Sequence, residues 1–501
     1  MTKKILCIGN NTQDTDIKTR KIAQADAQPY HGLLSELTRP LTSIDYNKSG
    51  YYHSSIYDIE FGKLVELCSK FDQVIMLHQP KSQWSHPDAF YRTIKLLDTV
   101  SVPVTLLDPS YKKSIGYFEN LVHENKSFCI FPFIELLVKF DHTTVCCRSS
   151  TPITHINELK NFSTDENYNR IRTKMMRGEL VPEHCSSCYR LEDKGIISAR
   201  MQETVEWANR LNLSSFQDLE KILEPVYYEV RADNKCNLQC RTCRPNDSHL
   251  IEKEYKTLGI SVVPAKKNTI GFDIVKFDQL KKLYVAGGEP TLLSGFYQFL
   301  DRCISTQHTD IEILVNTNGT KINDRLKRQL KHFSNFQFIF SIDGFDQLNY
   351  YIRWPSAWNT IIDNWHYLRS QGHKITVNTT VSIYNIASLD QIFEFIDSEF
   401  PGTLIHCQLV IEPDIMSPFL HPYPGQVLQS LYRVTQLNAF KNDLLFASSI
   451  NGYIRYFENN PLPNTTMLKK FFEFNDKLDH SRQIKLKTYL PELDNYRNFI
   501  V

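Results

Sequence analysis

Long apolar runs are missing from this sequence of 501 residues. The most apolar stretch, FCIFPFIELLVKF at residues 128–140, is interrupted by Pro132 and Glu135 and is shorter than the ~20 residues that span a bilayer. The apolar run that precedes Gly9 is too short for the core of a secretory signal. We therefore expect a cytoplasmic protein that does not interact with membranes.

An excess of one charge sign is also missing. The 57 lysines and arginines almost balance the 56 acidic residues, so the formal net charge is +1. A neutral chain has no global field that attracts nucleic acid or an anionic membrane. A recognisable RNA-binding module is missing too, so nucleic acid is a disfavoured partner, although RNA modification remains an alternative.

The N-terminal part has the pattern of an α/β domain but lacks a nucleotide-binding motif. Short β-branched runs at residues 4–9, 73–78 and 102–107 alternate with helix-like segments, which predicts a Rossmann-like domain over residues 1–118. The sequence GNNT after the first run is not GxGxxG. A scaffold or docking domain is therefore the alternative to a nucleotide-binding domain.

A second βα pattern begins near residue 226 and predicts the main domain. Six β-branched runs are separated by helix-compatible segments: 227–232, 282–287, 311–316, 336–343, 374–383 and 404–412. Six βα units in succession predict an α/β fold with a parallel sheet, curled into a partial (β/α)6 TIM-like barrel over residues 216–420. Ligands of such sheets bind beyond the C-terminal ends of the strands. The tail, residues 421–501, is predicted to be a helical extension.

Twelve cysteines are present, and they are expected to be reduced in a chain that is not exported. Four stand apart in patterns typical of buried small side chains: Cys7, Cys68, Cys303 and Cys407. The others form two groups. The denser group lies in CNLQCRTC, which contains Cys236, Cys240 and Cys243 and follows the first predicted barrel strand.

Three clustered thiols favour an iron-sulfur cluster. Thiolates bind zinc or iron-sulfur clusters, and a closed zinc site needs four ligands. No fourth ligand follows Cys243 at zinc-finger spacing. A loop with Cys236, Cys240 and Cys243 can instead hold three corners of a 4Fe-4S cube and leave the fourth iron open for a substrate.

The CxxxCxxC pattern resembles the cluster-binding loop of the radical S-adenosylmethionine (SAM) superfamily, and further motifs follow in that family's order. They are AGGEP with Gly287, Gly288, Glu289 and Pro290, VNTNGT with Asn316, SIDG with Ser341, YYIRWP with Arg353, and VNTTVS with Asn378. The resemblance implies that Cys236, Cys240 and Cys243 bind the catalytic 4Fe-4S cluster. It also implies that the other residues named here bind SAM.

The residue types suit these implied roles. Glycines at 287 and 288 let the backbone approach a ligand closely, as the family's GGEP motif does at the amino group of SAM. Arg353 can hold the methionyl carboxylate through two parallel hydrogen bonds. Ser341 and Asn378 are suited to ribose hydroxyls, although either could instead cap a turn. Thr242 stands where the family often has an aromatic residue, which leaves adenine packing unassigned.

The resemblance implies reductive chemistry. The cluster delivers one electron to SAM, which yields methionine and a 5'-deoxyadenosyl radical that abstracts hydrogen from a substrate. An electron donor such as flavodoxin or ferredoxin is then required. The DxHxxG loop expected of cobalamin-dependent relatives is missing, which disfavours methyl transfer through cobalamin.

The second cysteine group resembles parts of the twitch and SPASM extensions of radical SAM enzymes, which hold an auxiliary 4Fe-4S cluster. The resemblance implies a four-thiolate set, in which Cys146 could replace its neighbour: Cys129, Cys147, Cys185 and Cys188. This module, at 119–215, precedes the barrel instead of following it, and His142 stands where a hairpin glycine is expected. Zinc is the alternative metal, because four cysteines bind either.

These features predict a radical SAM enzyme of the SPASM/twitch group. The expected reaction is modification of a peptide or protein side chain, or oxidation of a small metabolite. A non-catalytic iron-sulfur or zinc scaffold is the alternative from another class. The intact CxxxCxxC and GGEP motifs and Arg353 argue against that alternative.

Overall fold

The computed structural model describes strand segments 5–9, 51–55, 73–76 and 104–106, and residues 117–500 apart from 147–150, 194–197, 263–270, 411–412 and 460–462. The chain divides into two compact units. The first contains Met1–Lys126 and Arg190–Ser215, and the second contains Ser127–Tyr189 and Phe216–Val501. The segment predicted as one cysteine-rich module, 119–215, is thus shared between the two units.

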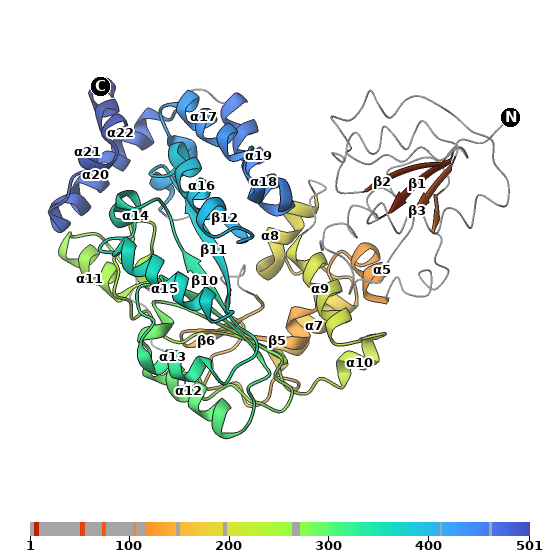
Figure 1. The fold of residues 1–501 in the computed structure, drawn as a ribbon. Coiled ribbons are helices and arrows are strands. Elements are labelled where there is room, and N and C mark those ends of the chain that lie inside the picture. Colours follow the sequence, from red (N-terminus) through yellow and green to blue (C-terminus); the bar gives the residue numbers. More distant parts are fainter. Residues whose placement is uncertain are drawn as a thin grey trace. The chain divides into compact units, whose positions relative to one another are not determined.

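The first unit contains a four-stranded parallel sheet in the order β2-β1-β3-β4 (Figure 1). Its strands are β1 (Ile5–Gly9), β2 (Tyr51–Ser55), β3 (Gln73–Met76) and β4 (Val104–Leu106). The order reverses at β1, as in doubly wound α/β sheets. The three runs predicted as strands are confirmed, whereas β2 was not predicted because YYHSS has no apolar alternation. The helices expected between them lie outside the described residues.

The second unit is built on an eight-stranded sheet in the order β12-β11-β10-β9-β8-β7-β5-β6. Its main strands are β7 (Tyr227–Arg231), β8 (Lys282–Ala286), β9 (Glu312–Thr317), β10 (Phe336–Ser341), β11 (Lys374–Val381) and β12 (Ile405–Leu409). Each pairs in parallel with the next. The six predicted strands are confirmed, and the sheet is open because β12 and β6 are its edges.

Two strands from the cysteine-rich segment extend this sheet. Strand β5 (Glu135–Lys139) pairs in parallel with β7, and β6 (His142–Thr144) pairs antiparallel with β5. Strand β5 was missed in the sequence because the apolar run 128–140 has no strict alternation, and β6 follows that run and has only three residues. As a result, part of the predicted auxiliary module is continuous with the barrel sheet.

Helices follow the strands and cover one face of the sheet (Figure 1). Up to the end of the predicted barrel, the helices of the second unit are α6 (Phe131–Ile134), α7 (Glu166–Met176), most of α8 (Pro182–Glu192), α10 (Phe216–Glu220), α11 (His249–Thr257), α12 (Ser294–Ser305), α13 (Asp324–Leu330), α14 (Gln347–Ile352), α15 (Trp358–Ser370) and α16 (Leu389–Glu399). Helices α5 (Tyr117–Glu124) and α9 (Ala199–Arg210) belong to the first unit. Helices α12, α13, α15 and α16 share one apolar core with the strands.

Alternation along each strand separates this core from the polar face of the sheet. In β10, Phe336, Phe338 and Phe340 are buried in the core, while Ser341 is half-buried on the opposite face. The isolated Cys303 is fully buried, as predicted. The polar face therefore carries the side chains that can meet a ligand.

The C-terminal extension is helical, as predicted. It contains α17 (Pro424–Val434), α18 (Asn438–Asn442), α19 (Leu444–Asn459), α20 (Thr465–Arg482), α21 (Leu486–Tyr489) and α22 (Pro491–Asn495). Helix α20 begins where the Asn464 side chain accepts a hydrogen bond from Met467 N, and ends at Gln483, which has φ of 56°. Within the described part of the chain, no helix is long and apolar enough to cross a membrane.

Candidate active site

The three clustered cysteines lie in the loop that leaves the C-terminal end of β7. Cys240 is buried, while Cys236 and Cys243 are half-buried. The loop is held by short local hydrogen bonds, such as Cys243 N to Cys240 O at 3.1 Å. Cys236 N donates to His249 Nδ1 at 3.2 Å, which connects the loop to the start of α11.

Burial and the neighbouring thiols raise the pKa values of these cysteines. Burial, reinforced by Cys240, raises the pKa of Cys236 to about 12. Burial also raises the pKa of Cys243 well above its usual value, and Cys240 and Cys236 add to this effect. Bringing three sulfur ligands together in a buried loop fits a 4Fe-4S cluster, which binds cysteines as thiolates.

A single metal ion, unlike a 4Fe-4S cluster, needs several ligands that converge on one point. Among the described residues, no three His, Cys, Asp or Glu side chains are placed to hold one ion together. A 4Fe-4S cube takes each cysteine on a different iron. Its ligands therefore need not converge on one point.

The glycines of the GGEP motif are required by the cluster loop itself. A Cβ at Gly288 would lie 2.2 Å from Lys235 O, and one at Gly287, which has φ of +122°, would lie 2.7 Å from Asp233 O. The two segments are hydrogen-bonded, from Gly288 N to Asp233 O at 3.0 Å and from Glu289 N to Lys235 O at 2.7 Å. The sequence predicted that the backbone at these glycines approaches a ligand closely. In the structure it also approaches the segment of the protein that immediately precedes Cys236.

Glu289 joins this loop to the end of β9. Its carboxylate accepts hydrogen bonds from Thr317 Oγ1 and Asn318 N, both at 2.7 Å, and from the hydroxyl and N–H of Thr291. Burial raises the pKa of Glu289, although these hydrogen bonds act in the opposite direction. With its oxygens occupied in this way, Glu289 acts as an anchor of the loop.

Asn316, Ser341 and Asn378 come together at the C-terminal ends of β9, β10 and β11. Ser341 lies opposite Asn378 in the strand register, and its Oγ donates to Asn316 Oδ1 at 3.2 Å. Asn378 Oδ1 is buried without a hydrogen-bond partner. A buried acceptor without a partner is costly unless a ligand supplies the donor.

Arg353 lies directly after α14. Its Nη1 donates to Asp343 Oδ2 at 2.8 Å, and its Nε is buried without a partner. Burial acts to lower the pKa of Arg353, but Cys240 and Asp343 outweigh it and raise the pKa. A fixed cation with an unused donor therefore lies next to the cluster cysteines.

Two supporting residues were missed in the sequence although their motifs were noticed. Asp343 of SIDG orients Arg353 and accepts from Thr380 N at 2.7 Å. Asn318 of VNTNGT donates to Asn237 Oδ1 at 2.9 Å, inside the cluster loop. Both act on residues distant in the chain, so only the motif could have pointed to them.

A second group of cysteines gathers in the second unit. Burial raises the pKa of Cys129 well above its usual value, and Cys185, Cys146 and Cys188 contribute in that order. Cys185 and Cys188 are both buried on α8, one turn apart. Cys185, Cys146 and Cys188 thus affect the charge state of Cys129, although no three of these described side chains are placed to hold one metal ion. Cys147 lies outside the described residues.

The comparisons with known proteins assign the class of this site. The sequence model of the radical SAM superfamily matches residues 233–396. This match covers the cluster loop, GGEP and the C-terminal ends of β8 to β11. The chain therefore contains a radical SAM domain, and the prediction of that class is confirmed.

Two curated relatives are similar to about a third of this chain. An uncharacterized protein, MJ0907, of Methanocaldococcus jannaschii is 25% identical over 174 residues, which cover 33% of this chain and 57% of that protein. The Fe-coproporphyrin III synthase of Methanosarcina barkeri is 22% identical over 167 residues, which cover 33% of this chain and 39% of that protein. The match thus spans about half or less of each relative.

Solved structures match more distantly. One is described as native anSMEcpe with bound AdoMet and Cp18Cys peptide. It is 16% identical and has a TM-score of 0.30, and the match covers 45% of this chain and 61% of that one.

Proposed function

We propose that this protein is a radical SAM enzyme in which Cys236, Cys240 and Cys243 hold the catalytic 4Fe-4S cluster. One observation carries the proposal: one buried and two half-buried thiols of the same loop lie beside Arg353, whose Nε has no partner among the described residues. When bound, the reduced cluster supplies the electron that splits SAM into methionine and a 5'-deoxyadenosyl radical, which removes hydrogen from a substrate.

The remaining side chains bind and orient SAM. Arg353 holds the methionyl carboxylate with its unused donor, while Asp343 keeps the guanidinium in place. Asn378, supported by Ser341 and Asn316, supplies the acceptor for a ribose hydroxyl. The backbone at Gly287–Pro290 faces the amino group, with Glu289 as the anchor of the loop.

The second cysteine group is proposed to hold an auxiliary 4Fe-4S cluster, as in twitch and SPASM enzymes. Cys129, Cys185 and Cys188, completed by Cys146 or Cys147, would close the cluster with four thiolates. Such a closed cluster would supply an acceptor for one electron from a substrate that has lost a hydrogen atom, which would make the overall reaction a two-electron oxidation. Zinc remains the alternative occupant.

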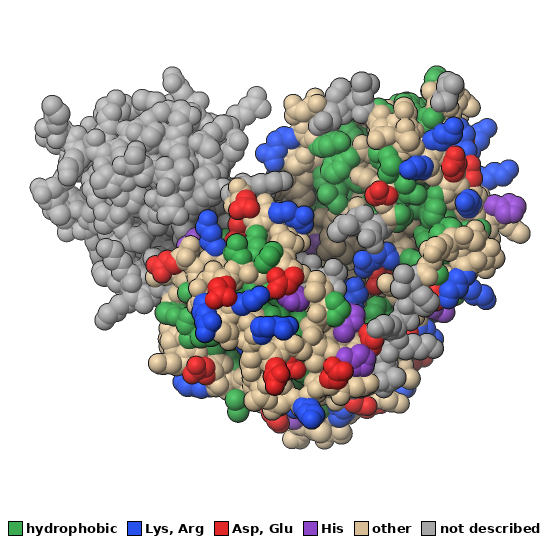
Figure 2. Space-filling model, turned by 180° about the vertical axis from the view of Figure 1, so that it is seen from behind, with side chains coloured by type: hydrophobic (Ala, Val, Ile, Leu, Met, Phe, Trp, Pro, Cys, Tyr) green, Lys and Arg blue, Asp and Glu red, His purple; other side chains and the backbone are tan. Residues whose placement is uncertain are grey.

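The substrate is proposed to be a peptide or protein side chain, or a small metabolite. The name of the Methanosarcina relative is that of an enzyme that makes a small molecule. RNA is disfavoured, since Lys and Arg are interspersed with Asp and Glu on the visible face of the described residues (Figure 2). Flavodoxin or ferredoxin is proposed as the electron donor, and the cytoplasm as the location.

Anaerobic reconstitution tests the proposal. The iron-loaded protein, once reduced and supplied with SAM, is expected to form 5'-deoxyadenosine and methionine in equal amounts. Its reduced cluster is also expected to change its electron paramagnetic resonance (EPR) signal when SAM binds the open iron. A folded, iron-loaded protein that gives neither result would instead be a scaffold.

A further inference from the structure

An arginine is buried inside the cluster motif, where the sequence indicated no role for it. Arg241 lies between Cys240 and Cys243 and has no solvent-exposed surface. Its guanidinium lies 3.7 Å from the centre of the Tyr351 ring, and its Nε donates to Tyr351 O at 2.9 Å. The side chain thus leaves the cluster loop and enters the protein interior.

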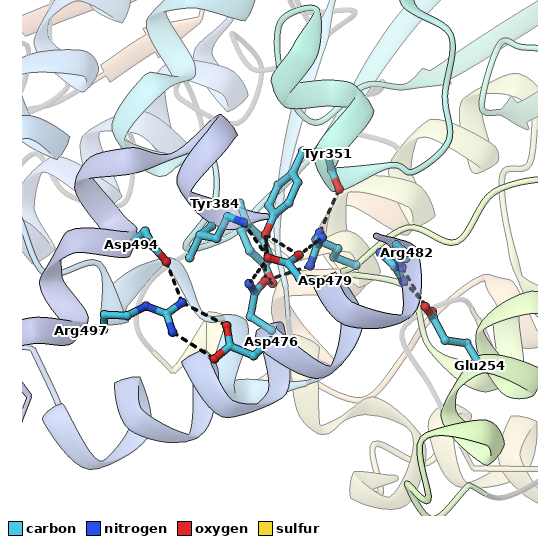
Figure 3. Close-up of polar contacts among 11 residues, drawn as sticks. Glu254, Tyr351, Tyr384, Asp476, Asp479, Arg482, Asp494 and Arg497 are labelled. Atoms are coloured by element: carbon cyan, nitrogen blue, oxygen red, sulfur yellow. Dashed lines mark hydrogen bonds and ion pairs between the residues drawn. The ribbon is translucent and has the colours of Figure 1, made fainter. Parts of the chain in front are cut away.

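The partners of Arg241 come from the C-terminal extension, on α20. Nη1 donates to Asn475 Oδ1 at 2.9 Å, and Nη2 forms an ion pair with Asp479 Oδ1 (Figure 3). The hydroxyl of Tyr351 also donates to Asp479, at 3.0 Å, and that of Tyr384 donates to Asn475 at 2.9 Å. These contacts fix the guanidinium in one orientation.

A second buried ion pair joins the same helix to the segment that follows the cluster loop. Arg482 binds Glu254 of α11 through two hydrogen bonds, of 2.9 Å and 2.7 Å (Figure 3). The two side chains are 1% and 2% exposed. We call Asn475, Asp479 and Arg482 the C-terminal clamp.

The clamp acts where the two halves of the SAM site meet. Gln239 N donates to Trp354 O at 2.6 Å, and Arg241 N donates to Ile352 O at 2.7 Å. These two hydrogen bonds join two segments of the chain. One segment contains Arg353 between the two acceptors, and the other contains Cys240 between the two donors. Any shift of Arg241 therefore changes the position of Cys240 relative to Arg353.

Buried ion pairs are a poor way to stabilise a fold, because desolvation offsets much of the attraction. Apolar residues of similar volume would hold α20 against the barrel at least as well. A planar guanidinium with fixed acceptors does what apolar residues cannot, since it sets direction as well as distance. The arrangement therefore favours a positioning role.

We propose that the C-terminal clamp positions the cluster loop, through Arg241, so that the open iron and Arg353 can bind one SAM molecule together. The inference rests on the proposed SAM-cleaving function. Arg241 and Asp479 are positioning residues, which act through Cys240 and Arg353. The C-terminal extension thereby becomes part of the SAM site.

The test compares Arg241→Lys and Asp479→Asn with Asp476→Asn in the full-length, reconstituted protein. Asp476 is the matched control, because it lies on α20 but forms an exposed pair with Arg497 (Figure 3). For each protein, iron content, melting temperature, the EPR change on adding SAM and the rate of 5'-deoxyadenosine formation are measured. A structural role alone would affect only the first two.

Arg241→Lys and Asp479→Asn are expected to keep their iron but to form 5'-deoxyadenosine at least about tenfold more slowly, because small misplacements of reacting groups are costly. Their EPR response to SAM is expected to be weaker. Asp476→Asn is expected to match the wild type. Wild-type rates and EPR responses in both Arg241→Lys and Asp479→Asn would overturn the inference. A wild-type protein that does not cleave SAM would instead refute the proposed function.

A double variant covers the case in which the single variants do not fold. Arg241→Met with Asp479→Leu replaces the ion pair by apolar contact and is expected to restore folding and iron binding. The inference predicts that this variant remains slow in SAM cleavage. Wild-type cleavage by the double variant would show that apolar packing suffices and would overturn the inference.

Discussion

Arg353 combines two functions in one side chain. Asp343 holds Nη1, while Nε is buried without a partner and faces no competing acceptor within the described residues. Such an arrangement costs stability unless a ligand completes it. In the proposed SAM site, the Nε of Arg353 would meet the methionyl carboxylate without reorganisation of the side chain.

Replacing Arg353 by alanine is expected to weaken SAM binding by about 2 kcal/mol, because a charge-assisted pair of hydrogen bonds is lost. Iron content should not change, since Arg353 binds no iron. Equilibrium dialysis under anaerobic conditions measures the affinity. Arg325→Ala, which removes an exposed pair with Asp301, is the control and should bind SAM normally. Unaltered affinity in Arg353→Ala would assign the carboxylate to another residue.

Gly288→Ala tests the contact between the GGEP loop and the cluster loop. The new Cβ would lie 2.2 Å from Lys235 O, so one backbone must move, at a cost of about 1–3 kcal/mol. Denaturant unfolding should show this loss, and reconstitution should show less bound iron. Gly425→Ala is the control, because its Cβ would meet nothing within 4 Å. Equal stability of the two variants would contradict the packing described here.

At this scale the sequence predicts the residues that occur in motifs and misses those that act over long distances. Cys236, Gly288 and Arg353 were predicted as site residues because they lie in motifs that resemble those of the radical SAM superfamily. Arg241 was not, because its partner Asp479 lies 238 positions away in the chain. The role of Glu289 as an anchor was hidden for the same reason.

At the scale of elements, the strands with a clear apolar pattern were predicted, whereas β2, β5 and β6 were not. β9 and β10 alternate strictly between buried and half-buried residues, which is the pattern that sequence reasoning detects. β6 has three residues, too few for a period to be visible. Its pairing with β5 depends on tertiary contacts.

The α8 cysteines provide a test of the auxiliary cluster. Wild-type protein is expected to bind about eight irons per chain, and Cys185→Ala with Cys188→Ala about four. Elemental analysis also decides between iron and zinc. The single variants Cys146→Ala and Cys147→Ala identify the fourth ligand, because only one should lose the second cluster. One zinc with about four irons in the wild type would make the module a structural zinc site.

The segment between β12 and α17 contains a buried histidine that should make the fold acid-sensitive. Burial lowers the pKa of His421 to about 4, and its Nδ1 accepts a hydrogen bond from Tyr423 N at 3.4 Å. The unfolded chain has the ordinary pKa of about 6.5, so it binds the proton more tightly than the folded chain. Stability is thus complete above pH 6.5 and falls by up to about 3 kcal/mol as the pH approaches 4.

Denaturant unfolding of the iron-free protein between pH 7 and pH 4 measures this loss. His421→Gln should flatten the dependence, whereas the exposed His332→Gln should not. An unchanged slope in His421→Gln would assign the acid sensitivity to other groups.

At the scale of the whole molecule, the second unit assembles its site from segments far apart in the chain. The parallel sheet brings the ends of β7 to β11 to one edge, where cluster loop, GGEP and the polar strand ends meet. The order of these elements could be predicted because each βα unit repeats the same pattern. The contribution of α20 could not, because a helical tail shows no sign of what it contacts.

We propose above all that Cys236, Cys240 and Cys243 hold the cluster that cleaves SAM. The most direct measurement is the yield of 5'-deoxyadenosine from reduced, reconstituted protein and from the variant with all three cysteines replaced by alanine. We expect 5'-deoxyadenosine from the wild type and none from the variant. The variant should still retain the iron bound by the second cysteine group. Undiminished product from the triple variant would contradict this proposal.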